Sequence, residues 1–103
     1  INQQYKDFME DIEVENLCLD LKKSILEIYH PGASGIKKLN LPDKIMGLSY
    51  AIQSKENNLI IKTSNRSLVC KTGLPVKFDA DVKGGDLIIK SEYDSGIISI
   101  QRD

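Results

Sequence analysis

The residues of this chain that could do chemistry are few and lie far apart in the sequence. Two of them are the cysteines Cys18 and Cys70, which could either form a disulfide or remain as two buried thiols. Another is Asn65, because Asn65-Arg66-Ser67 matches the acceptor sequence for N-glycosylation. This tripeptide lies in a predicted turn between two strands, where a glycan could be attached at the surface.

The remaining reactive side chains do not form a recognisable catalytic or metal site. His30 is the only histidine, and its position before Pro31 at the end of a predicted helix favours a capping role. Asp79 and Asp81 alternate with lysines along a predicted strand, a pattern typical of a solvated strand face and not of a calcium site. We therefore predict no enzyme activity, no catalytic residues, no metal site and no cofactor.

Composition indicates an ordinary globular domain. The 103 residues are enough for a single domain with one core, and 41% of them are hydrophobic and 28% charged. The net charge of −1 gives no general attraction to nucleic acid or to anionic membranes, so we predict neither as a direct partner. The sequence contains no apolar run of about 18 residues, so we expect no membrane span and no secretory signal within it.

Residues 1–30 read as one long amphipathic helix that stops at Pro31. Two apolar sets recur at helical spacing and are out of phase with each other. Either the helix bends, or its two halves face different surfaces, and we favour the second interpretation. The first set comprises Ile1, Tyr5, Phe8 and Ile12, and the second Val14, Cys18, Leu21, Ile25 and Tyr29, widened by Leu17, Leu26 and Ile28.

The start of this helix has two further features. Acidic residues crowd its first half, which either stabilises the positive end of the helix dipole or forms an acidic docking face. The helical pattern is already in progress at Ile1, without a capping residue before it. We therefore expect that a further segment precedes Ile1.

Residues 31–103 read as a β-rich head domain. Short alternating segments separated by turn residues predict about seven antiparallel strands, arranged as a meander, a sandwich or a strongly curled sheet. The predicted fold class is α+β, with the long N-terminal helix packed on this sheet. Residues 14–30 should form one globular unit with residues 31–103.

The order of these elements resembles that of the archaeal type IV pilin-like proteins, which are made with a class III signal peptide. The resemblance lies in the helix ending Tyr29-His30-Pro31-Gly32, the following Leu41-Pro42, and the strands around Leu48–Ile52 and Asn58–Ile61. The closing segments Gly84–Ile89 and Gly96–Ile100 are also similar. The long apolar helix that is the family's hallmark is not in this sequence.

The resemblance implies a structural subunit of an archaeal cell-surface filament, extracellular and used for adhesion or attachment. Its partners would be other pilin subunits, and it would meet the membrane only through the expected preceding segment, before assembly. Tyr5, Phe8 and Ile12 would then lie at subunit contacts. An extracellular location would favour a Cys18–Cys70 disulfide and glycosylation of Asn65. The alternative is a surface-anchored β-domain that binds a partner protein without polymerising, such as an archaellum accessory protein.

Overall fold

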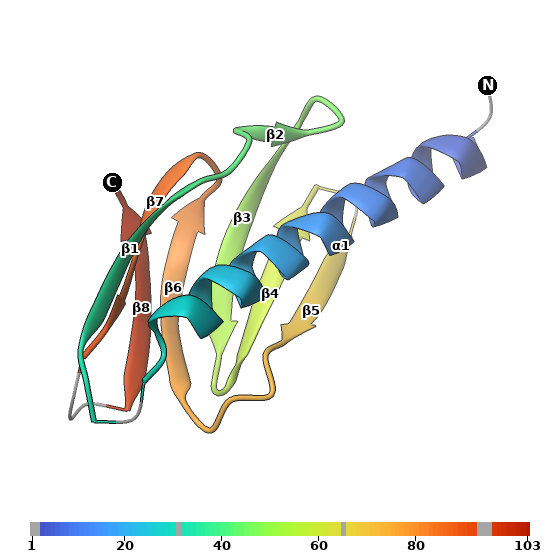
Figure 1. The fold of residues 1–103 in the computed structure, drawn as a ribbon. Coiled ribbons are helices and arrows are strands. Elements are labelled where there is room, and N and C mark those ends of the chain that lie inside the picture. Colours follow the sequence, from blue (N-terminus) through green and yellow to red (C-terminus); the bar gives the residue numbers. More distant parts are fainter. Residues whose placement is uncertain (1–2, 31, 65, 93–95) are drawn as a thin grey trace.

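One long helix lies across one face of a curved β-sheet (Figure 1). The computed structural model describes residues 3–30, 32–64, 66–92 and 96–103, with side chains from Phe8 onward. The helix, α1, spans Gln3–Ile28. The described strands form one eight-stranded, mostly antiparallel sheet, so the predicted α+β class with a helix packed on a sheet is confirmed.

The strands form where apolar and polar residues alternate, because successive side chains of a strand point to opposite faces of the sheet. In the segment Lys77–Lys83, for example, Phe78 and Ala80 are buried, whereas Asp79 and Asp81 are exposed. The eight strands are β1 (Gly35–Asn40), β2 (Lys44–Ile45), β3 (Leu48–Lys55), β4 (Asn58–Thr63), β5 (Ser67–Lys71), β6 (Lys77–Lys83), β7 (Asp86–Ser91) and β8 (Ile97–Arg102).

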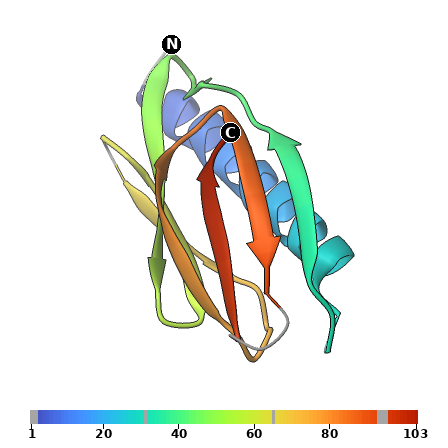
Figure 2. The same cartoon turned by 90° about the vertical axis from the view of Figure 1, so that its left-hand side faces the viewer.

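The strand order is not that of a simple meander. It runs β1-β7-β8-β6-β3-β4-β5, with β2 paired to β3. Only β3-β4-β5 and β7-β8 follow the predicted hairpin connections, and β8 lies between β7 and β6, parallel to β6. Figure 2 shows that α1 and the strands form two layers, so that one sheet face carries no helix.

The element boundaries differ from the prediction in three places. The helix ends at Ile28 instead of residue 30. The first strand, β1, begins at Gly35, several residues before Leu39, where the alternation of Leu39 and Leu41 about Asn40 predicts its start. The two-residue strand β2 was not predicted. It joins β3 through Met46-Gly47, both with positive φ, as two-residue hairpins require. Because methionine rarely adopts this conformation, the sequence carries no clear signal for that turn.

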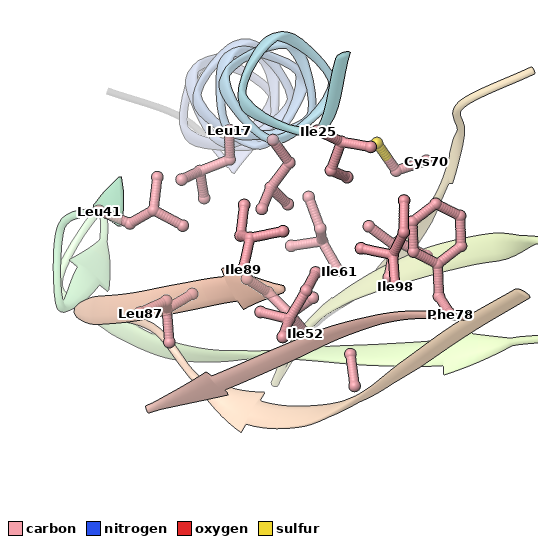
Figure 3. Close-up of a cluster of buried hydrophobic side chains, with 14 of the residues drawn as sticks. Leu17, Ile25, Leu41, Ile52, Ile61, Cys70, Phe78, Leu87, Ile89 and Ile98 are labelled. Carbon is pink, nitrogen blue, oxygen red and sulfur yellow. The ribbon is translucent and has the colours of Figure 1, made fainter. Parts of the chain in front are cut away.

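The core lies between α1 and the sheet. Leu17 and Ile25 of the helix point toward the strands, where they meet Ile52, Ile61 and Ile89 (Figure 3). All five side chains are almost completely buried. Burial of such aliphatic side chains contributes about 1.5–3 kcal/mol each, so this layer is the main source of stability.

Tyr50 closes one end of the core beside the β6–β7 turn. Its side chain is 3% exposed, and its hydroxyl donates a hydrogen bond to the carbonyl oxygen of Pro42. The ring lies directly against Gly84, whose position leaves no room for a side chain. Burial, together with the nearby negative charge of Asp43, raises the pKa of Tyr50 to about 12.

This raised pKa predicts a loss of stability at high pH. The folded state holds the proton more tightly than the unfolded chain does, so the contribution is complete below the unfolded pKa of about 10 and is lost as the pH rises toward 12. We expect the free energy of unfolding, measured with urea, to fall over this range. Tyr50→Phe should remove that fall and cost about 1 kcal/mol at neutral pH. An identical alkaline decline in Tyr50→Phe would contradict the assignment.

Candidate functional site

A row of large apolar side chains lies on the solvent side of α1. Phe8 is 60% exposed, Ile12 36%, Leu19 59% and Leu26 56%. They are spaced by 4, 7 and 7 residues, and at about 100° per residue this spacing places them along one line of the helix. We call these four residues the outer stripe.

The outer stripe lies on the side of α1 opposite the core face. The residues of the core face also recur at intervals of three or four, but they point to the other side of the helix. It comprises Val14, Leu17, Leu21, Ile25 and Ile28, all buried. The helix is therefore apolar on two opposite sides, of which the sheet covers one.

This arrangement bears on the predicted contact residues. Phe8 and Ile12 are exposed, as a contact role requires, although the role itself stays a prediction. The side chain of Tyr5 lies outside the described residues. Leu26 was predicted on the face toward the sheet and is instead exposed, because it points about 100° away from its buried neighbour Ile25. Leu19 was missed, although it continues the first apolar set two helical turns beyond Ile12.

An ion-pair cluster holds the first half of α1 against the β4–β5 turn. Arg66 places its Nε atom 3.1 Å from Oε2 of Glu10, and it also donates a hydrogen bond to Asp11. The Glu10 side chain is almost fully buried, at 4% exposure. Such a buried carboxylate requires a cationic partner, so Arg66 fixes the position of the helix at this point. The helix that bears the outer stripe is therefore held in place against the sheet.

The predicted disulfide is present. Cys18 of α1 and Cys70 of β5 are bonded, with their Cα atoms 5.7 Å apart (Figure 3). The bond joins the middle of the helix to an edge strand of the sheet. It supplies a second anchor for α1, about two turns beyond the one made by Arg66.

The glycosylation candidate Asn65 lies outside the described residues. Its neighbours form a compact turn, in which the Thr63 amide donates to the Arg66 carbonyl at 2.9 Å and the Arg66 amide donates to the Thr63 hydroxyl at 3.2 Å. Ser64 and Ser67 are exposed on either side of Asn65. Modification of Asn65 itself stays a prediction.

The surface also contains a groove between α1 and the β2 hairpin. It has a volume of about 420 Å³ and charged groups on both sides. Its lining residues are Glu13, Asn16, Leu17, Asp20, Pro42, Lys44, Ile45 and Met46. The groove is open and shallow, so it could accept part of a partner protein more readily than it could enclose a small molecule.

Other groups remain dispersed. Within the described ranges, no three His, Cys, Asp or Glu side chains gather in a way that could hold a metal ion. Asp79 and Asp81 lie on the uncovered face of β6 together with Lys77 and Lys83. No helix in the described part of the chain is long and apolar enough to cross a membrane.

Comparison with known proteins found no matching family model, no matching curated protein and no matching solved structure. The proposals below therefore depend on the geometry of the described residues, with the outer stripe of α1 as the main feature.

Proposed function

We propose that this chain is a structural subunit of a cell-surface filament, of the kind built by archaeal type IV pilin-like proteins. In this proposal its copies associate through the outer side of α1, while the sheet forms a head exposed on the filament. The observation that carries the proposal is the outer stripe. Four large apolar side chains in line along one helix are more than scattered surface hydrophobics, and such a patch is typical of a protein contact.

Two features of the fold support a mechanical role. The Cys18–Cys70 disulfide and the Arg66 cluster hold α1 to the sheet at separate points. A helix fixed in this way can transmit load from a neighbouring subunit to the head without being pulled away. The disulfide is also typical of proteins in an oxidising environment, which agrees with a location outside the cell.

The proposal predicts association in solution. Sedimentation velocity over a range of concentrations should show reversible self-association of the chain. The double variant Phe8→Glu/Ile12→Glu should weaken it by at least about tenfold, because two charges enter an apolar contact. Ile36→Glu is the matched control, since Ile36 is 65% exposed but lies on β1, away from the helix stripe. A strictly monomeric wild-type chain would overturn the proposal.

A second candidate is the surface-anchored domain that binds a partner protein without polymerising. The groove between α1 and the β2 hairpin favours it, because its charged lining from Glu13, Asp20 and Lys44 could contact a partner. A monomeric chain that binds a partner, with loss of binding in Lys44→Glu and full binding in the stripe variant, would favour this function over the filament.

A further inference from the structure

The charges of this protein are separated between its two layers. The helix α1 contains seven acidic and three basic residues, which gives it a net charge of −4. The opposite, uncovered sheet face bears the reverse charge. Its outward-pointing charged residues in β1 and β3 to β8 are Lys38, Lys55, Lys62, Lys71, Lys77, Lys83 and Lys90, with Asp79, Asp81 and Asp86.

The uncovered sheet face also has an apolar centre on β4 and β5. Ile60 and Val69 are paired in register and both point away from the core, and Val69 is 51% exposed. Lysines occupy the adjacent positions on both sides. Lys62, which pairs with Ser67, lies on one side of the Ile60–Val69 pair, and Lys71, which pairs with Asn58, lies on the other. We call Ile60, Val69, Lys62 and Lys71, with Lys55 beside them on β3, the sheet patch.

The first half of the outer stripe has the complementary pattern. Phe8 and Ile12 supply exposed apolar side chains, and Glu15 is an exposed acidic residue close to them on the helix, as is Asp11, which is also paired with Arg66. An apolar strip with acidic neighbours thus matches an apolar pair with basic neighbours. Opposite charges around an apolar centre accelerate association and determine how the two surfaces align with each other.

We propose that the outer stripe of one copy docks on the sheet patch of the next copy. The inference rests on the proposed function, which requires contact through α1, and adds the surface that receives the helix. The two surfaces lie on opposite layers of the molecule, so the contact is head-to-tail, a kind of contact that builds a ring where the rotation closes and an open filament where it does not. In the open assembly each added copy presents a free sheet patch or a free stripe, which is what a growing filament requires.

A pairing of helix with helix is the competing arrangement. The outer side of α1 does not carry the whole charge of the helix, because Glu10 is buried against Arg66 and Lys22 and Lys23 lie near the second half of the stripe. An antiparallel pair could therefore place Glu15 near Lys22, but it would leave the apolar pair Ile60–Val69 and the lysines around it uncovered. The uncovered basic patch with an apolar centre therefore favours the contact between helix and sheet.

Mixing two variants tests the proposal directly. Phe8→Glu damages the stripe and keeps the sheet patch, whereas Val69→Glu damages the patch and keeps the stripe. Each variant alone should be monomeric by sedimentation velocity. An equimolar mixture should form a heterodimer and nothing larger, because the intact stripe of Val69→Glu meets the intact patch of Phe8→Glu.

Two further measurements accompany the mixing test. Ile36→Glu should associate like the wild type, and added salt should weaken the wild-type assembly by screening the charges.

Charge reversal gives a second test that does not depend on apolar residues. Glu15→Lys alone, and Lys62→Glu/Lys71→Glu alone, should each weaken association by about tenfold. All three changes in one chain should restore most of the affinity, a recovery that misfolding could not produce.

The outcomes separate the two proposals. If Phe8→Glu prevents association while Val69→Glu associates like the wild type, the helix pairs with another helix; the docking proposal then fails and the filament proposal stands. If the wild-type chain is monomeric at every concentration, both proposals fail.

Discussion

Replacing Gly84 with alanine is expected to destabilise the fold by about 3 kcal/mol, a large part of the stability of a domain of this size. A Cβ atom at this position would lie 2.1 Å from Cζ of Tyr50 and 2.3 Å from its hydroxyl oxygen. The ring has little freedom to move aside, because it is buried and its hydroxyl is bonded to Pro42. Urea unfolding of the purified variant measures the effect.

Two further variants show whether the clash with Tyr50 is the cause. Gly47→Ala is a control for the loss of a glycine in a turn, since Gly47 has a φ of 77° and no atom within 4 Å of an added Cβ. It should cost only about 1 kcal/mol. In a Tyr50→Leu background, Gly84→Ala should cost much less than in the wild type. Equal costs in the two backgrounds would show that the ring is not responsible.

Removal of the disulfide is expected to lower the free energy of unfolding by about 4 kcal/mol. Cys18 and Cys70 are 52 residues apart, and the bond restricts the unfolded chain in proportion to the logarithm of that loop length. The variant Cys18→Ala/Cys70→Ala should therefore unfold at a much lower urea concentration. Cys70 is completely buried, so its truncation adds a small cavity term to this loss.

Reduction of the wild-type protein separates the crosslink from the cavity. Dithiothreitol breaks the crosslink but leaves both cysteine side chains in place, so it creates no cavity. It should therefore lower the free energy of unfolding of the wild type by the crosslink part of the loss, which is most of it. It should leave Cys18→Ala/Cys70→Ala unchanged. If oxidised and reduced wild-type protein unfold at the same urea concentration, the disulfide does not contribute as proposed.

The local elements were predictable, because they depend on near neighbours in the sequence. Strict alternation around Phe78 and Ala80 predicted β6, and the turn at Glu56-Asn57 predicted the β3–β4 hairpin. The strand order was not predictable in this way. The parallel pairing of β6 with β8 joins segments whose contact depends on the whole sheet, and no local pattern encodes it.

The candidate site was predictable only in its first half. Phe8 and Ile12 follow helical spacing and were predicted as an exposed stripe. Leu19 and Leu26 continue it at intervals of seven residues, but each is within two positions of a core-face residue in the sequence. Where apolar residues occur on both sides of a helix, spacing alone cannot say which side the sheet covers. The sheet patch, which we propose as the surface that receives the stripe, depends on strand register, which the sequence does not reveal.

The position of β8 has a consequence for how the protein reaches its native state. Among the described strands, β8 alone connects the pair β1–β7 to the group β6-β3-β4-β5 by backbone hydrogen bonds. It is also the last of the eight to leave the ribosome. The two parts of the sheet therefore remain separate during synthesis, each with an unpaired edge that could aggregate, until residues 97–102 join them. The last strand of the sheet in chain order is therefore also the one that determines when its two parts become a single structure.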